Sequence, residues 1–169
     1  MKFIVFSLLL LSLASLKCEE AYAQIYSTTI QRPANIVGSL IIGENIATIK
    51  NFEATPNNDA LICKIKGIYF VSSSLQPAAL YPGINGHLGF WFELNNKPIS
   101  ASTNRSYVTE HMPIILATSP FLIALDQGDT IGTRFASTGP NIGITYIDPP
   151  SNSEPSIASY TLSIYKVDN

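Results

Sequence analysis

Two histidines and two closely spaced aspartates are the residues that could support metal or acid–base chemistry. His87 and His111 lack the close spacing to Glu that a metal-binding β-barrel enzyme needs. Asp126 and Asp129 flank Gly128 and could bind calcium, but the more direct interpretation is that Asp129 shapes a turn. We therefore expect no cofactor and no metal-dependent enzyme, with calcium at this turn as the alternative.

Nucleophilic chemistry has equally little support. The chain has many serines but no G-x-S-x-G motif between a strand and a helix, as a hydrolase nucleophile would require. Cys18 falls in an N-terminal leader that we expect to be removed, which leaves Cys63 without a disulfide partner. Cys63 lies among apolar residues, so we predict that it is a small, buried and reduced side chain. From these motifs we predict no catalytic residue in the chain.

Two further residues are candidates for surface roles. Trp91 stands on the second face of an alternating strand, where it either contacts a ligand or packs under a loop. Asn104-Arg105-Ser106 matches the glycosylation sequon, which matters only in a eukaryotic secretory pathway.

Residues 61–71 indicate the element around which the fold is organised. Leu61, Cys63 and Ile65 alternate with lysines, as in a strand with one buried face. After Gly67 the run of residues 68–71 is apolar without interruption, as in a strand covered on both faces. This pattern predicts a segment that changes sheets at a glycine bend in a two-sheet sandwich.

The remaining chain predicts short strands and no helix. Strands are expected within residues 25–30, 36–49, 87–94, 114–116, 121–125, 130–136 and 157–167. Two long loops are also expected. Residues 72–86 carry Pro77, Pro82, Gly83 and Gly86, and residues 137–156 are rich in Pro, Gly, Ser and Asn. Such spacing describes an all-β, antiparallel sandwich or barrel, and the Cys–Trp–Cys spacing of immunoglobulin domains is absent.

The N-terminus has the features of a signal peptide. Lys2 precedes an apolar run over residues 3–16, and Ala21-Tyr22-Ala23 fits a small-x-small cleavage site. We predict that residues 1–23 are removed and that residues 24–169 form one secreted domain, located in the periplasm or at the cell surface if the source is bacterial. The mature chain should have no membrane span, and its formal charge of −2 gives no basic patch for nucleic acid.

Four sequence blocks carry a family resemblance. The segment C-K-I-K-G-I-Y-F-V of residues 63–71 resembles the C-K-V-P-G-L-Y-x-F signature of the globular C1q domain, a branch of the tumour-necrosis-factor-like jelly rolls. Residues 89–98 (GFWFELNNKP), 122–131 (LIALDQGDTI) and 159–162 (SYTL) are similar to later blocks of that family, in the same order. The resemblance implies a two-sheet jelly roll that assembles as a homotrimer.

The resemblance also indicates where subunits would meet. The apolar runs 68–71 and 121–125 have a second apolar face that a two-layer sandwich leaves uncovered. We therefore predict a subunit interface that includes Ile68, Tyr69, Phe70, Phe121, Ile123, Tyr160 and Leu162. The last strand lacks the family's F-S-G-F core and carries Ser159, Thr161 and Ser163 on one face, so this contact should be wetter or weaker.

Two functions fit these features. The first is a secreted, non-enzymatic recognition module, a homotrimer that binds an extracellular protein or glycan through its loops. The alternative is a structural surface or matrix protein whose trimers pack into a layer. Discrete trimers in solution would favour recognition, and concentration-driven larger assemblies would favour a layer.

Overall fold

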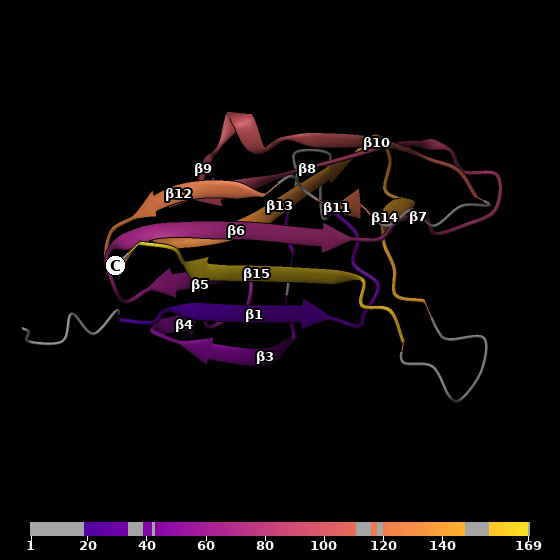
Figure 1. Ribbon diagram of the computed structural model, residues 1–169. Helices are drawn as coiled ribbons and strands as arrows, with labels where there is room; N and C mark the ends of the chain where they lie inside the picture. Colours follow the sequence, from indigo (N-terminus) through magenta and orange to yellow (C-terminus); the bar gives the residue numbers. More distant parts are fainter. Residues whose placement is uncertain are drawn as a thin grey trace, which may run out of the picture.

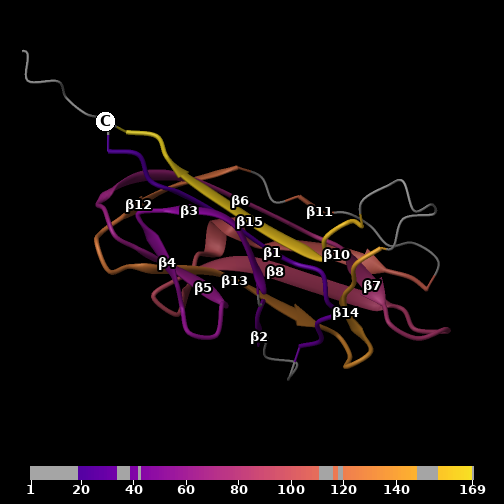
Figure 2. The ribbon, with the colours of Figure 1, turned by 90° about the horizontal axis from the view of Figure 1, so that it is seen from below.

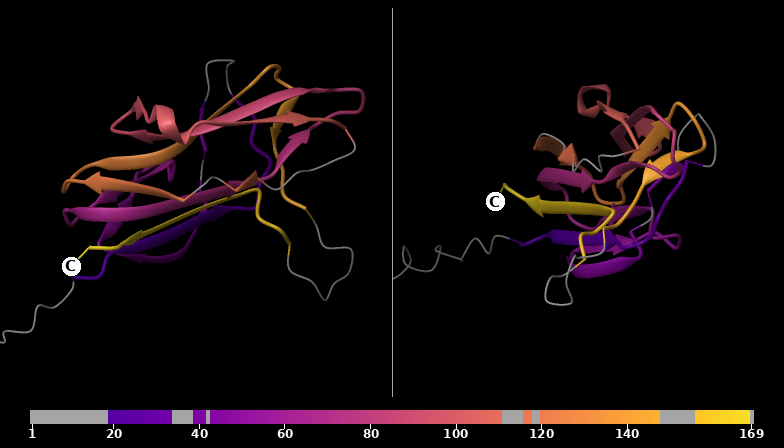
Figure 3. Two further views of the ribbon diagram at one scale, coloured as in Figure 1. Left: turned by 45° about the horizontal axis from the view of Figure 1, so that its top comes forward. Right: turned by 90° about the vertical axis from the view of Figure 1, so that its right-hand side faces the viewer.

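The protein folds as a two-layer β-sandwich. The computed structural model describes residues 19–33, 39–41, 43–110, 116–117, 120–147 and 156–168. Within them, the sheet that we call inner runs in the order β11-β6-β15-β1-β3, with β12 also paired to β6. The outer sheet runs β10-β8-β13-β5-β4, with β2 on β13 and β9 on β8. Figure 1 shows β6, β15 and β1 side by side in one layer, and Figure 3 shows the two layers from further directions.

The strands are mostly short and every pairing between them is antiparallel. The inner sheet contains β1 (Tyr22–Ser27), β3 (Asn45–Lys50), β6 (Gly67–Leu75), β11 (Leu116–Ala117), β12 (Phe121–Leu125) and β15 (Tyr160–Lys166). The outer sheet contains β2 (Ser39–Leu40), β4 (Phe52–Ala54), β5 (Ala60–Cys63), β8 (Gly86–Leu94), β9 (Lys97–Pro98), β10 (Asn104–Val108) and β13 (Thr130–Ser137). A third sheet pairs β7 (Pro77–Ala79) with β14 (Ile142–Ile144), and a 3-10 helix spans Ser100–Ser102.

Residues 61–71 change sheets as predicted. β5 belongs to the outer sheet and ends at Cys63, whereas β6 belongs to the inner sheet and begins at Gly67. A Cβ at Gly67 would lie 2.4 Å from the Lys166 Cε and 2.7 Å from the Asp168 Oδ1, so the ends of these two side chains would have to move. The glycine therefore leaves room for the Lys166 and Asp168 side chains at the start of β6.

The core lies between the two sheets and contains side chains from both. β8 alternates as predicted, with Leu88, Phe90 and Phe92 buried. The larger fully buried side chains come from the inner strands β1, β6, β12 and β15 and the outer strands β5, β8 and β13; they are Ile25, Tyr69, Leu75, Leu125, Tyr160, Leu61, Leu88, Phe90, Phe92, Ile131 and Phe135, together with Ile41. This single cluster joins the layers and fixes which face of each strand points outward.

Two turns follow from the residues that occupy them. Asn95 and Asn96 both have positive φ, 51° and 61°, and join β8 to β9 as a two-residue hairpin loop. Asparagine tolerates this left-handed backbone better than most residues. Asp129 shapes the next turn because its Oδ2 accepts a hydrogen bond from the Asp126 backbone N–H at 2.8 Å, as the sequence predicted.

The two predicted loops contain more strand than expected. β6 continues through residues 72–75 because Ser73 and Leu75 still point into the core and pair with β15. Inside the predicted loops, β7 and β14 pair with each other at the end of the sandwich opposite the C-terminus, as Figures 1 and 2 show. Prolines and glycines indicated a loop over residues 72–86, but Pro77 begins the short strand β7 and Gly86 begins β8. Residues 148–155 lie outside the described part.

The N-terminal strand begins before the predicted cleavage site. Ala21 and Ala23 are buried, and the Lys166 backbone N–H donates to the Ala21 carbonyl at 2.8 Å. The predicted cut between Ala23 and Gln24 thus falls within β1. Residues 1–18 of the predicted leader lie outside the described part, and the leader stays a prediction.

Candidate functional site

The outward face of the inner sheet carries the first candidate site. Along β6, Tyr69 and Val71 point into the core, while Ile68 and Phe70 point outward. On β12, Leu122 and Ala124 point outward, and Leu122 is 63% exposed. Both apolar runs thus present apolar side chains on the side away from the core, as the sequence indicated.

Strand register aligns these side chains into a row. Leu122 of β12 lies opposite Phe70 of β6, which lies opposite Tyr165 of β15. The Phe70 and Tyr165 rings stack with centroids 4.8 Å apart and an interplanar angle of 24°. We call Leu122, Phe70 and Tyr165, together with the neighbouring Ile68, the apolar ladder. Tyr165 and Ile68 are 46% and 44% exposed, so the ladder is a continuous accessible surface across three strands.

The same face becomes polar further along the strands. Ser72 lies opposite Ser163, and Ser74 lies opposite Thr161. The Gln24 side-chain amide donates to the Ser163 hydroxyl at 3.0 Å. A partner covering this face would therefore meet an apolar end and a hydroxyl-rich end. Thr161 and Ser163 lie on this face as predicted, whereas Ser159 is buried and donates to the Ser27 carbonyl at 3.1 Å.

Three residues predicted for the subunit interface lie in the core. Tyr69, Tyr160 and Leu162 are almost completely buried, so their side chains are not on the predicted face. Strand alternation explains the error: Phe70 rather than Tyr69, and Tyr165 rather than Tyr160 or Leu162, point outward. Phe121 and Ile123 are partly buried and pack against the core, while their neighbours Leu122 and Ala124 are exposed.

Both core tyrosines have satisfied hydroxyls. The Tyr69 hydroxyl donates to the Ile65 carbonyl at 2.6 Å, and the Tyr160 hydroxyl donates to the Thr133 hydroxyl at 2.9 Å. Burial raises the pKa of both phenols well above the ordinary value of 10; for Tyr69 the bond to Cys63 acts in the same direction. These groups stay neutral inside the fold over the physiological range.

Cys63 is buried, as predicted. Its side chain is inaccessible, and its thiol lies 2.9 Å from the Ile65 carbonyl, to which it donates. Cys63 is also a free cysteine. The thiol completes a small buried cluster around the Ile65 carbonyl and has the environment of a packing residue.

The turn after β12 is stabilised by an ion pair and a hydrogen bond within the chain. Asp126 pairs with Lys66 at 2.7 Å, and the Asp129 Oδ1 accepts a hydrogen bond from the Asn95 side-chain amide at 2.7 Å. Among the described residues, no group of three or more His, Cys, Asp or Glu side chains could hold a metal ion. The geometry assigns the two aspartates a structural task.

The remaining predicted residues lie on the outer sheet. Trp91 is half-buried on the outward face of β8, and His87 is exposed on the same face. Asn104 lies on β10, where its side-chain amide donates to the Ser102 carbonyl at 3.2 Å, and its glycosylation stays a prediction. His111 lies outside the described residues. The outer sheet therefore keeps Trp91 away from the apolar ladder.

This fold is the C1q/TNF-like jelly roll. The solved structures of murine APRIL at pH 5.0 and pH 8.0 are similar to this chain, each with a TM-score of 0.51, at 12% and 13% identity, with 88% of this chain and 99% of that chain covered. The globular domain of zebrafish complement 1qA protein matches with a TM-score of 0.53 and 9% identity over 88% of this chain and 98% of that chain.

The sequence comparisons add nothing to this likeness. No protein-family model matches the chain, and the search of curated proteins gives no significant match. In the described part of the chain, no helix has the length and apolar character needed to cross a membrane.

Proposed function

We propose that this protein is an extracellular, non-enzymatic recognition module that assembles as a homotrimer through the apolar ladder. The observation that carries the proposal is the row Leu122–Phe70–Tyr165, which one protomer leaves exposed across three paired strands. Soluble monomers rarely expose a contiguous apolar patch larger than roughly 300–600 Å2. A second and third copy of the chain would cover the row.

The composition of the ladder supports a subunit contact. Interface centres are depleted in charge and enriched in aromatic residues, and the ladder has two aromatic rings and two aliphatic side chains. Burial contributes about 25 cal/mol per Å2, reduced by the ordering cost of association. The hydroxyl-rich end around Ser163 would make this contact wetter than a fully apolar one.

Ligand binding is proposed for the end of the sandwich that carries β7 and β14. The two predicted loops meet there because β7 and β14 pair. A trimer would present three copies of this end on one side, which raises avidity without any new contact.

Export is proposed from the leader. Because Ala21 and Ala23 are buried in the folded domain, a peptidase could cut between Ala23 and Gln24 only before β1 pairs. Cleavage of an unfolded chain during export satisfies this condition. Intact mass measurement of the exported protein should find Gln24 at its N-terminus, and a start at Met1 would contradict the proposal.

Analytical ultracentrifugation tests the assembly directly. We expect residues 24–169 to sediment as a discrete trimer at micromolar concentration and the Leu122→Glu variant as a monomer, because the charge would be buried without a partner. The matched control is Ile30→Glu, since Ile30 is similarly exposed but lies outside the strands of the ladder.

Two results would overturn the proposed trimer. A monodisperse, soluble monomer of the unaltered chain at the same concentration would show that the apolar ladder is stable in water without a second and third copy. A mass that keeps growing with concentration would instead favour the layer-forming alternative.

A further inference from the structure

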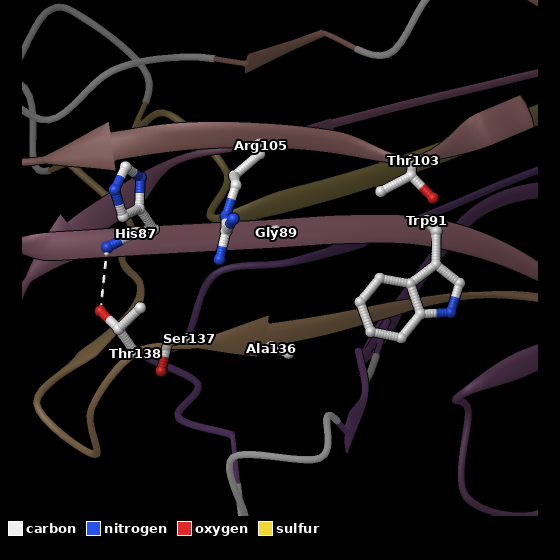
Figure 4. A pocket seen from close by; sticks show the side chains of 8 residues that line it. All are labelled: His87, Gly89, Trp91, Thr103, Arg105, Ala136, Ser137 and Thr138. Carbon is white, nitrogen blue, oxygen red and sulfur yellow. Dashed lines mark hydrogen bonds between the residues drawn. The ribbon is translucent and has the colours of Figure 1, made fainter. Parts of the chain in front are cut away.

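A groove crosses the outward face of the outer sheet, on the layer opposite the apolar ladder. Its volume is about 350 Å3, within the range of small-molecule sites. Strand pairing aligns its central row, because Arg105 of β10 lies opposite Gly89 of β8, and Gly89 lies opposite Ala136 of β13. Along β8, Trp91 and His87 stand on the two sides of this row (Figure 4).

The floor is low because its residues are small. At Gly89, an added Cβ would meet only the Asn104 carbonyl, at 3.6 Å, so the missing side chain leaves open space rather than relieving a clash. Ala136 beside it adds a single methyl group. A ring-shaped ligand could therefore rest on the sheet between the taller side chains.

The indole wall is held in place from below. The Trp91 Nε1 donates to the Glu93 Oε1 at 3.4 Å, and the same carboxylate pairs with Arg134 at 2.7 Å. Glu93 is buried and ion-paired, so the Trp91 indole has a fixed polar partner and loses less side-chain freedom on ligand binding than an unpartnered ring would.

Arg105 supplies a positive charge at the centre of the groove. Its exposed side chain reaches from β10 across Gly89, as Figure 4 shows. Its guanidinium makes no ion pair or hydrogen bond with any residue that the structure describes. A guanidinium presents a planar set of donors that matches a carboxylate in two parallel hydrogen bonds.

We propose that this groove binds a sugar that carries a carboxylate, such as a uronic acid. The Trp91 indole packs against the C–H face of the sugar ring, and Arg105 binds its carboxylate. The Thr138 hydroxyl, which already accepts the His87 backbone N–H at 3.0 Å, and the His87 imidazole bind ring hydroxyls. The proposal goes beyond the binding proposed above for the β7–β14 end, because it adds a second site, on the outer sheet, and names its ligand class. The groove is complete within one protomer.

Fluorescence provides a direct readout because Trp91 is the only tryptophan of the chain. We expect D-glucuronic acid, titrated at constant ionic strength, to change Trp91 emission saturably. Glucose provides the sugar ring without the carboxylate, and acetate provides the carboxylate without the ring. Each should bind at least tenfold more weakly than glucuronic acid. Arg105→Gln should raise the dissociation constant for glucuronic acid about tenfold, because it removes one charge-assisted hydrogen-bonded pair.

Two further variants keep the test decisive. Gly89→Val should abolish binding by filling the floor, and the open space above Gly89 lets it fold. Lys97→Gln removes a cation at the exposed β9 hairpin and should bind as the unaltered chain does. Equal binding of glucose and glucuronic acid would overturn the role of Arg105, and absence of any saturable change would overturn the site.

The assembly and the groove can fail separately. The Leu122→Glu monomer should bind glucuronic acid with the affinity of the unaltered chain, because all lining residues come from one protomer. Binding by a chain that never forms trimers would refute the proposed trimer and leave the groove standing. A stable trimer that binds no carboxylated sugar would refute the groove and leave the trimer standing.

Discussion

The two outward faces of the sandwich use the same strand alternation to make opposite surfaces. On the inner sheet, Leu122, Phe70 and Tyr165 fill adjacent positions across three strands and form a raised apolar row. On the outer sheet, the corresponding row of Arg105, Gly89 and Ala136 has almost no side-chain volume in two of its three positions. A filled row suits a broad protein contact, whereas an interrupted row leaves room for a small ligand.

The largest expected effect separates the two faces of a single strand. Tyr69→Ala should lower the free energy of unfolding by about 3–5 kcal/mol, because it empties a fully buried site and removes the hydrogen bond to the Ile65 carbonyl. Phe70→Ala should leave the protomer folded and weaken association instead. Urea unfolding and sedimentation at one protein concentration would measure both.

The Tyr69→Ala and Phe70→Ala variants together test which side chains of β6 face the core and which face outward. Equal losses of unfolding free energy in Tyr69→Ala and Phe70→Ala would show that β6 does not alternate between core and surface. A Phe70→Ala variant that sediments as the unaltered chain would show that the apolar ladder is not the contact.

The next largest effect is a loss of unfolding free energy at alkaline pH. It arises from Tyr160, which is buried in the core between the two sheets. Burial raises the pKa of Tyr160 above its ordinary value of 10, so above pH 10 the unfolded chain loses this proton while the folded chain keeps it. Stability that is fully present below pH 10 is therefore lost as pH rises, by up to about 1.4 kcal/mol per pH unit for this group.

A substitution isolates the contribution of Tyr160. Tyr160→Phe should unfold at lower urea concentration at neutral pH, because the Thr133 hydroxyl loses its partner, but its stability should decline less steeply above pH 10. Phe90→Leu, which alters the same core but removes no ionisable group, should keep the slope of the unaltered chain. An unchanged slope in Tyr160→Phe would show that the buried phenol of Tyr160 is not the cause of the alkaline loss.

The smallest effect concerns the crossing between the sheets. Cys63→Ser should cost less than about 1 kcal/mol, because the serine hydroxyl can donate to the Ile65 carbonyl as the thiol does. A thiol reagent should modify Cys63 slowly in the native protein and rapidly in urea, because the side chain is buried. Rapid labelling of the folded protein would show that Cys63 is accessible to solvent and that this face of β5 does not point into the core.

Sequence patterns predicted the fold well where they depend on local alternation. The change at Gly67 from a half-apolar to a fully apolar run marks the crossing from one sheet to the other, and the Asn95-Asn96 turn ends β8 at the expected place. Patterns failed where a strand carries serines, as in residues 72–75, because three serines in a row show no contrast between the buried and the outward face of β6.

The candidate surfaces were harder to predict. An uninterrupted apolar run gives no indication of which residues point outward. Tyr69 and Phe70 were therefore both assigned to the interface, although Tyr69 is buried, and Leu122 was missed. Arg105 and Ala136 join Trp91 and Gly89 only through strand register, which couples positions far apart in the chain. Alternation counted from the buried Leu125 would have identified Leu122 as a residue of the opposite face.

The pairing of β1 with β15 has a consequence for the order of folding. The two strands lie side by side along their whole length (Figure 1), and residues as distant as Gln24 and Ser163, 139 positions apart, share a hydrogen bond. Among the described strands, β15 alone joins β1 to β6, so the inner sheet stays split until β15 has been synthesised. Such distant pairing makes folding slow. A growing chain would then remain open through translation, which is the condition that passage through an export channel requires.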